Sequence, residues 1–175
     1  MKWFRRKEKE EFLCPVCGES HAGQPTDIGF ALPDVVWNQG PEVRQQHLDW
    51  STDMCHFEGK WFIRGVLEAP FQFQAEDFAW GIWVEVAEED FSQYYRLYEV
   101  DGANLPLGQG TIANEIKAFP GTTGLPVTIQ FRSPDKRPTF QLLDNEEHQL
   151  ATLQRDGMTI EQYHEALESM KPTTS

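Results

Sequence analysis

The stretch Lys60–Phe71, KWFIRGVLEAPF, together with Asp77–Ala87, DFAWGIWVEVA, decides the fold. Side chains alternate through both stretches with a period of two residues, which is typical of β-strands that bury one face. The segment between the two stretches has the length of a hairpin loop, so we expect the strands to pair antiparallel. One parity of the second stretch is apolar throughout: Phe78, Trp80, Ile82, Val84 and Val86.

Further elements are expected on both sides of this hairpin. Alternating residues predict strands over 127–132 and 139–143, with SPDKRP as the turn between them. Helical spacing predicts helices over 41–50 and 88–98, and the Gly- and Pro-rich segment DGANLPLGQG is expected to interrupt the chain.

The end of the chain is expected to be helical. A helix through HQLATLQR should end at Gly157, and Thr159 with Gln162 has the spacing of a capping box for the next helix. The whole pattern is an antiparallel β-sheet with flanking helices and an N-terminal zinc-knuckle-like loop. It predicts a fold of the α+β class.

Length and composition fit one domain. The chain has 175 residues, and its content of 39% hydrophobic and 13% aromatic residues can supply a sizeable core. No internal repeat and no Ser/Gly-rich linker divides the sequence. We therefore expect a flexible basic arm over residues 1–11, a single α+β domain over 12–170 and a disordered tail over 171–175.

Net charge restricts the choice of partners. The formal charge is −13, and because the first ten residues, MKWFRRKEKE, carry five Lys or Arg against two Glu, the rest of the chain carries −16. A body of this charge repels phosphate backbones and anionic lipid headgroups. We expect no binding to nucleic acid or to membranes. We expect the partner to be another protein, and the charge favours a basic one.

Three observations bear on the cellular compartment. No stretch approaches the about 20 consecutive apolar residues of a membrane span. The basic start is followed by EEFLCPVCG and not by the apolar region of a secretion signal. The three cysteines are an odd number, which does not suit a closed disulfide framework. Together these observations predict a cytoplasmic protein.

The segment FLCPVCGESH carries the clearest chemical signal. Cys14 and Cys17 have the C-x-x-C spacing with which a tight turn directs two thiolates at one metal ion, and Gly18 lets backbone amides approach the sulfurs. Free or redox-active thiols, or no special role, are the alternatives. A tetrahedral zinc site needs two more ligands. By residue type these are Cys55 and His21, with His56 and His47 as substitutes.

The order of several motifs resembles a known family. CPVCGESH is followed by STDMC, WFIRGVLEAPF and FAWGIWVEV, and later by an RP-x-F-x-L segment and DGMTIEQ. Over about residues 12–168 this order is similar to a bacterial family catalogued as domain of unknown function 2199, which has no assigned activity. The basic start MKWFRRKEKE is not part of the family pattern. The resemblance implies a four-ligand zinc site, because it places Cys14, Cys17, His21 and Cys55 at matching positions.

Arg64 lies in the first strand of the hairpin and shares a face with Phe62 and Val66. An unpaired charge is unfavourable in such surroundings, so we expect a structural ion pair; an anion-binding site is the alternative. The carboxylates close enough in sequence to pair with it are Asp53, Glu68 and Glu85.

The two tryptophans of the second strand face opposite sides by parity. Trp80 is expected in the core, and Trp83 is expected to line a ligand or partner surface. Arg64, Trp83 and Asp53 are thus the candidates for such a surface, with Trp83 placed on the opposite face from Arg64.

Two functions fit these features. The first is a non-catalytic binding protein, a zinc-stapled domain that serves as an adaptor or as an inhibitor of a basic partner. The second is an enzyme, either a thiol-dependent oxidoreductase that uses Cys14 and Cys17 or a hydrolase built around Arg64 and a carboxylate. The sequence contains no H-E-x-x-H, G-x-S-x-G, G-x-G-x-x-G or P-loop motif, so the first function is favoured and no reaction is suggested.

Overall fold

The computed structural model describes residues 11–13, 16–18, 20–22, 26–144 and 146–169. Apart from residue 11, the expected basic arm lies outside these ranges, and so does the expected tail.

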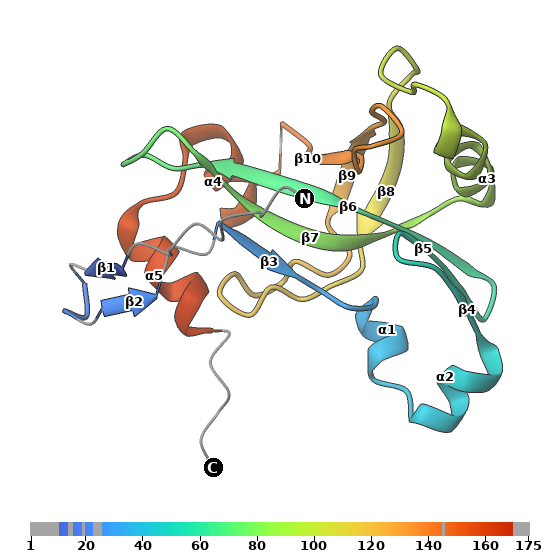
Figure 1. The fold of residues 1–175 in the computed structure, drawn as a ribbon, viewed down its shortest axis with the longest axis horizontal. Helices are drawn as coiled ribbons and strands as arrows, with labels where there is room; N and C mark the ends of the chain where they lie inside the picture. The colour runs from blue at the N-terminus through green and yellow to red at the C-terminus, as the bar shows by residue number, and fades with distance from the viewer. Residues whose placement is uncertain (1–10, 14–15, 19, 23–25, 145, 170–175) are drawn as a thin grey trace, which may run out of the picture.

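The fold is built on one long hairpin. Strands β6 (Lys60–Pro70) and β7 (Asp77–Val86) pair antiparallel, from Trp61 opposite Val86 to Pro70 opposite Asp77. The hairpin crosses most of the molecule in Figure 1. Both strands are rich in β-branched and aromatic residues, which fit a pleated surface with a buried face. The predicted hairpin is confirmed.

Three further strands close the hairpin into a barrel. Strands β8 (Gly108–Ile112), β9 (Pro126–Gln130) and β10 (Thr139–Leu142) follow β7 as antiparallel neighbours, and β10 then pairs with β6. A closed meander with an odd number of strands joins its last strand to its first in parallel. Accordingly, Thr139 and Phe140 pair in parallel with Val66 and Leu67. The α+β class is confirmed, and its sheet contains a closed five-stranded barrel.

The barrel interior forms the main core. Odd-numbered residues of β6 and even-numbered residues of β7 face inward, which confirms the predicted parity and the placement of Trp80. Helices α4 (Gln149–Asp156) and α5 (Ile160–Glu168) pack against this core through residues such as Leu150 and Tyr163.

The boundaries of the two C-terminal helices follow the sequence. Helix α4 ends at Asp156 and is capped by Gly157, whose φ of 88° suits a residue without a Cβ atom. Helix α5 begins with a capping box in which Thr159 and Gln162 each bond the other's backbone N–H. Both predictions are confirmed.

Two glycines allow the barrel strands to approach one another. A Cβ atom at Gly65 of β6 would overlap the ring of Phe140 in β10 and would lie 2.6 Å from the carbonyl oxygen of Pro138. A Cβ atom at Gly110 of β8 would overlap the side chain of Val84 in β7. Side chains at these two positions would hold neighbouring strands apart, so the barrel closes because they are absent.

A second, smaller cluster lies on the outer face of the hairpin. Strand β5 (Met54–Phe57) pairs with β6 and carries β4 (Leu48–Trp50), both antiparallel, while β3 (Asp27–Gly29) adds to β7 in parallel. Helices α1 (Asp34–Trp37) and α2 (Pro41–His47) follow β3 in the chain. We call the cluster the outer cluster; its buried members are Leu32, Val36, Cys55, Phe57, Phe62, Trp83 and Ala113.

Two polar side chains fasten the loop after β8. Asn114 is fully buried and links three segments: it donates to Leu32 O and to Asp34 Oδ1, each at 2.9 Å, and accepts from the Trp83 N–H at 2.8 Å. The carboxylate of Glu115 accepts hydrogen bonds from the backbone N–H groups of Gly121 (2.6 Å) and Thr123 (3.1 Å). These bonds replace water for groups that the loop removes from solvent.

The other elements differ in detail from expectation. Helix α2 ends at His47 because β4 begins at the next residue, whereas a helix was expected to continue to residue 50. Helix α3 (Glu88–Arg96) continues as a 3₁₀ turn, η1 (Leu97–Glu99), in place of one helix over 88–98.

The N-terminal part contains a short hairpin where a loop was expected. Strands β1 (Glu11–Leu13) and β2 (Ser20–Ala22) pair antiparallel, and no zinc knuckle is seen in the described residues of this region. Of the helices that the described ranges contain, none has the length and apolar character of a membrane span.

Candidate functional site

One edge of β6 is shared by two strands. Strand β5 pairs with its first part and β10 with its later part. Where they meet, the backbone N–H of Arg64 donates to Asp53 O at 2.8 Å and that of Val66 donates to Pro138 O at 2.9 Å. The Arg137 side chain donates from Nε to Asp53 Oδ1 at 2.6 Å, so a salt bridge joins the segments that lead into the two strands. We call Asp53, Arg64 and Arg137 the strand junction.

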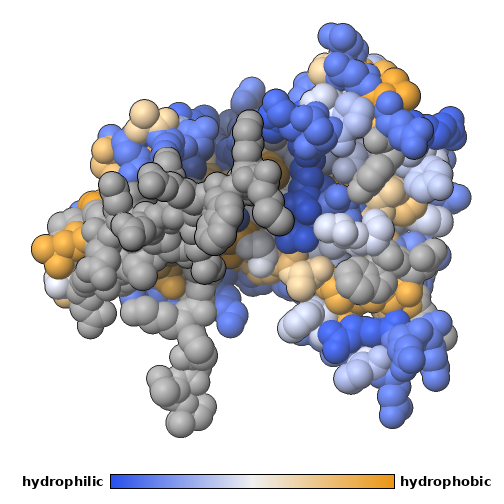
Figure 2. Space-filling view, viewed as in Figure 1, coloured by the Kyte–Doolittle hydropathy of each residue, from blue (hydrophilic) through white to orange (hydrophobic). Residues whose placement is uncertain are grey.

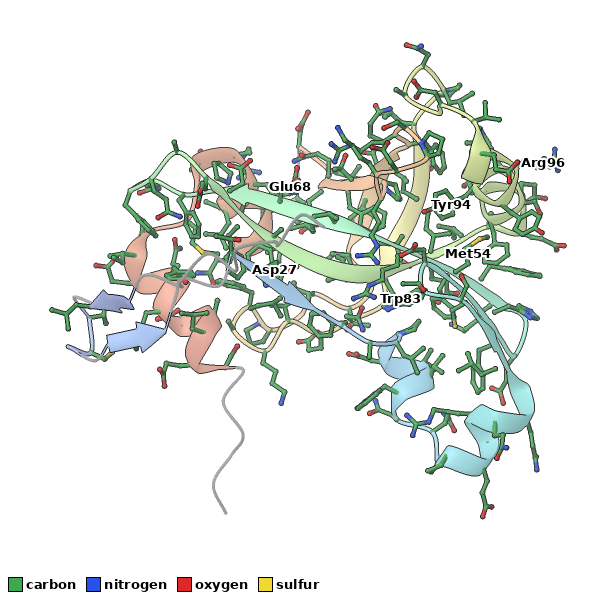
Figure 3. The ribbon with its side chains drawn as sticks, in the orientation of Figure 1. Asp27, Met54, Glu68, Trp83, Tyr94 and Arg96 are labelled. Atoms are coloured by element: carbon green, nitrogen blue, oxygen red, sulfur yellow. The ribbon has the colours of Figure 1, made fainter. Side chains whose placement is uncertain are left out.

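A pocket of about 280 Å³ opens beside the strand junction. It is lined by Asp53, by Tyr94 and Leu97 from α3 and η1, and by residues 131–137, which follow β9. Figure 3 shows Tyr94 on the side of α3 that faces the barrel. The Tyr94 ring stacks with Phe131, with centroids 6.1 Å apart and planes 25° apart. The junction pocket therefore combines an apolar wall with the polar turn 132–137.

Positive charge is concentrated around this pocket. Beyond the basic start, the described chain has nine Lys or Arg residues, against a formal charge of −13 for the whole sequence. Three of the nine, Arg132, Lys136 and Arg137, line the junction pocket, and Arg64 lies in the strand junction. Four of nine cations are thus gathered in one small region, which makes it a positive site on an acidic molecule.

Two carboxylates also line the pocket. Asp53 is bonded to Arg137, and a hydrogen bond from the Ser133 side chain is the main cause of a lowered pKa of Asp135. Asp135 is therefore ionised at neutral pH. With three cations and two carboxylates, the lining carries a net charge of +1.

Arg64 and Trp83 lie directly opposite each other across β6 and β7, so both project from the outer face. The expectation that they occupy opposite faces was wrong, because the hairpin loop pairs even positions of β6 with odd positions of β7. Trp83 has no exposed surface, and its indole N–H donates to Phe30 O at 3.2 Å. It belongs to the outer cluster and does not form the exposed surface that was expected.

The side chain of Arg64 occupies a space that two glycines leave open. A Cβ atom would lie 3.1 Å from Arg64 Nη2 at Gly29 and 3.7 Å from it at Gly81. The guanidinium carbon lies 6.0 Å from the ring centroid of Trp83. Figure 2 shows strongly hydrophilic side chains near the middle of the view, over the paired strands β6 and β7.

The charge of Arg64 is poorly compensated. Burial and then the positive charge of Arg137 lower the pKa of Arg64, and the carboxylate of Asp53 only partly opposes them. Its Nε atom is buried without a hydrogen-bond partner among the described residues. Asp53 and Glu85 instead form their salt bridges with Arg137 and Lys60. Among the described residues, Arg64 forms no salt bridge with Asp53, Glu68 or Glu85, so the prediction that one of these three carboxylates pairs with it was wrong.

The predicted zinc ligands are only partly described. Cys14 and the side chain of His21 lie outside the described part, while Cys17 is exposed between β1 and β2 and Cys55 is buried in the outer cluster. Figure 1 shows the β1–β2 hairpin and β5 at opposite ends of the molecule. In the described ranges, no group of three or more His, Cys, Asp or Glu could hold a metal ion. The zinc site stays a prediction.

The substitute ligands add nothing to the zinc hypothesis. The ring of His56 stacks on Trp61 with centroids 3.9 Å apart, and the side chain of His47 is not among those described.

Sequence reasoning missed the pocket cations Arg132, Lys136 and Arg137. It identified SPDKRP as a turn and did not consider its charge. The available signal was the run RSPDKR, which places three cations within six residues of an otherwise acidic chain.

A family model matches residues 13–158 and is described as "Uncharacterized protein conserved in bacteria (DUF2199)". The comparisons with curated proteins and with solved structures found no significant match. The matched range contains the whole strand junction and every residue that lines its pocket. The chain therefore belongs to this uncharacterised family of conserved bacterial proteins, as the order of its motifs indicated.

Proposed function

We propose that this chain is a non-catalytic binding domain that receives an anionic group of its ligand in the junction pocket. The observation that carries the proposal is the gathering of Arg132, Lys136 and Arg137 around one pocket, with Arg64 in the adjacent strand junction, in a molecule with a net charge of −13. Cations fixed in a concave site attract anions more strongly than the same charges spread over a surface, because the walls of the site exclude part of the solvent.

The geometry of the polar turn supports this role. Arg137 is held by Asp53, and its side chain remains 36% exposed, so it is oriented and still accessible. Arg132 and Lys136 lie in the same short segment, which follows β9 directly. A guanidinium whose position is fixed loses little conformational entropy when it binds a carboxylate or phosphate oxygen.

The lining favours binding over catalysis. Among the residues described around the pocket there is no histidine and no cysteine, and the hydroxyl of Ser133 is bonded to Asp135. The expected role as a zinc-stapled adaptor, or as an inhibitor of a basic partner, stays a prediction. A positive pocket in an acidic body fits a ligand whose anionic end enters that pocket.

The proposal is tested by titrating the purified full chain with sodium acetate and sodium phosphate at constant ionic strength and recording amide ¹H–¹⁵N spectra. We expect saturable shifts from at least one of the two anions, confined to residues 131–137 and to the neighbourhood of Asp53. The double variant Arg132→Gln/Lys136→Gln should weaken binding about tenfold, since each lost charge contact contributes a modest free energy.

The matched control is Arg96→Gln/Arg155→Gln, which removes the same charge elsewhere. Both control residues are exposed, and Figure 3 shows Arg96 directed away from the barrel. This variant should bind like the native protein. Absence of saturable shifts for both anions, or equal losses in the two double variants, would refute an anion site in the junction pocket.

A further inference from the structure

The junction pocket differs from a simple phosphate site in its balance of charge. Three cations and two carboxylates line it, so the net charge that a ligand meets is +1. Asp53 is held in a salt bridge with Arg137, and the pKa of Asp135 is lowered, mainly by a hydrogen bond from the Ser133 side chain. One negative charge balances this net charge, whereas the second charge of a dianion, such as phosphate at pH 8, would have no matching cation in the lining.

The second difference is the apolar wall. Tyr94 and Leu97 come from α3 and η1, are partly buried and line the pocket together with Phe131. Phe131 is only 2% exposed and supports the Tyr94 ring from behind through their stacking contact. An inorganic anion would leave this wall in water, while a ligand with an apolar body would cover it and gain the free energy of that burial.

Size sets the third condition. A volume of about 280 Å³ is at the lower end of the range of small-molecule sites. It suits one ring or one branched side chain with a short acidic arm.

We propose that the ligand group in the junction pocket is a monoanionic carboxylate attached to an aromatic or branched apolar body. Two sources share this chemistry: a free arylalkyl or branched-chain acid, and the C-terminal carboxylate of a polypeptide that ends in an apolar residue. This inference rests on the proposed function and specifies the ligand for the same site.

The test compares small probes on the full chain at constant ionic strength and pH 8, where inorganic phosphate is mainly the dianion. Phenylacetate has both features, acetate has only the charge, 2-phenylethanol has only the ring, and inorganic phosphate has a higher charge. We expect phenylacetate to bind with a dissociation constant of about a millimolar, as befits a ligand of this size, and the other three probes at least about tenfold more weakly.

Two variants distinguish the contribution of the apolar wall to binding from that of the cations. Tyr94→Ala should weaken phenylacetate about fivefold and leave acetate unchanged, whereas Arg132→Gln should weaken both. Tyr95→Ala is the control, because Tyr95 is 70% exposed and does not line the pocket. The melting temperature of each variant is recorded, and the ratio of phenylacetate to acetate affinity in the native protein remains a test even if Tyr94→Ala unfolds.

The outcomes distinguish this inference from the proposed function. If phosphate or acetate binds as tightly as phenylacetate, the inference is overturned and the anion site stands. If no anion binds, or if 2-phenylethanol equals phenylacetate, both are overturned. A further probe, an acetylated dipeptide that ends in phenylalanine, identifies the source of the ligand, and its C-terminal amide is the control without the charge. If the dipeptide acid binds more tightly than phenylacetate, the ligand is the C-terminus of a polypeptide. If phenylacetate binds more tightly, the ligand is a free acid.

Discussion

Arg137 Nε lies 2.6 Å from Asp53 Oδ1, and this contact joins two segments that are 84 residues apart in the chain at the edge of β6. The Asp53 side chain is 17% exposed and that of Arg137 is 36% exposed, so water screens the pair only in part. The salt bridge therefore contributes both to stability and to the geometry of the pocket.

A double-mutant cycle with Asp53→Asn and Arg137→Gln measures the strength of this salt bridge. We expect a coupling energy of about 1 kcal/mol from urea denaturation, toward the upper end for partly exposed pairs. The matched cycle with Lys60→Gln and Glu85→Gln concerns a more exposed pair, with side chains 48% and 38% accessible, and should give a smaller value. Equal coupling in the two cycles would contradict the special position of Asp53 and Arg137.

Arg64→Met is expected to leave the free energy of unfolding unchanged or to raise it. Methionine keeps an unbranched apolar stem of similar length, while it removes a charge that burial and Arg137 disfavour. Arg64→Ala should instead destabilise, because it empties the space beside Trp83. Chemical denaturation of both variants checks this. A strong loss of stability in Arg64→Met would show that the guanidinium is itself required for folding. If stability is kept and phenylacetate binding falls, Arg64 serves the site.

Gly65→Ala should destabilise the barrel by about 1–3 kcal/mol, the usual range for overpacking, because the new methyl group overlaps the ring of Phe140. Gly81→Ala is the control in the same hairpin, since its Cβ atom would meet neighbours no closer than 3.6 Å. The free energy of unfolding of this control should lie within about 0.5 kcal/mol of that of the native protein. In a Phe140→Leu background, Gly65→Ala should destabilise the protein less, because the ring that it overlaps is gone. If the losses of stability from the two substitutions simply add, there is no direct clash between the two side chains.

The carboxylate of Glu115 should stabilise the fold at neutral pH, and this contribution should be lost at acid pH. Burial alone would raise the pKa of Glu115, but hydrogen bonds from Gly121, Thr123 and Thr122 outweigh it, and the pKa is lowered overall. The stabilisation is therefore complete above the ordinary glutamate pKa of about 4.3 and is lost as the pH falls through the lowered pKa of the folded state. Glu115→Gln should be less stable than the native protein at pH 7, and the difference should shrink toward pH 3. The control Glu76→Gln, in the exposed hairpin loop, should show no such convergence.

The zinc hypothesis is settled by elemental analysis of protein purified without chelators. We expect one zinc ion per chain, and its loss in Cys17→Ser together with a lower melting temperature, because structural zinc stabilises the fold that holds it. Loss of zinc in Cys55→Ser as well would establish the four-ligand set. Retention of zinc in that variant would confine the site to the N-terminal region and leave Cys55 as a packing residue of the outer cluster. Native protein without zinc would contradict the hypothesis.

Much of the fold could be predicted because local patterns decide it. The alternation in β6 and β7, the stop at Gly157 and the capping box at Thr159 depend on residues close in sequence, and each is confirmed. Closure of the barrel was not predicted. Strand β8 contains Gly108 and Gly110, where a side chain would crowd the neighbouring strands. Glycine has a low β-propensity, so the sequence gives little indication of a strand at these positions.

The candidate site was found only in part for a related reason. Arg64 was identified as a charge among apolar neighbours, and Asp53 as a carboxylate close to it in sequence. The partner of Asp53 is Arg137, which a sequence pattern cannot assign across so many residues. Trp83 was misplaced because the face of one strand relative to another depends on the register of the hairpin. Long-range pairing, and not local propensity, determines which residues form the junction pocket.

The parallel seam that closes the barrel has a consequence for the order of folding. Thr139 pairs with Val66, 73 positions earlier, and the seam contains only two residue pairs, whereas the β6–β7 hairpin zips from one short loop. Closing so large a loop is entropically unfavourable until most other contacts exist, so we expect the seam to form after the other strand pairs of the barrel and to open before them. Hydrogen exchange at the Val66 amide should therefore be faster than at the centre of the hairpin. Because the junction pocket lies beside this seam, a ligand bound there should slow the separation of β10 from β6.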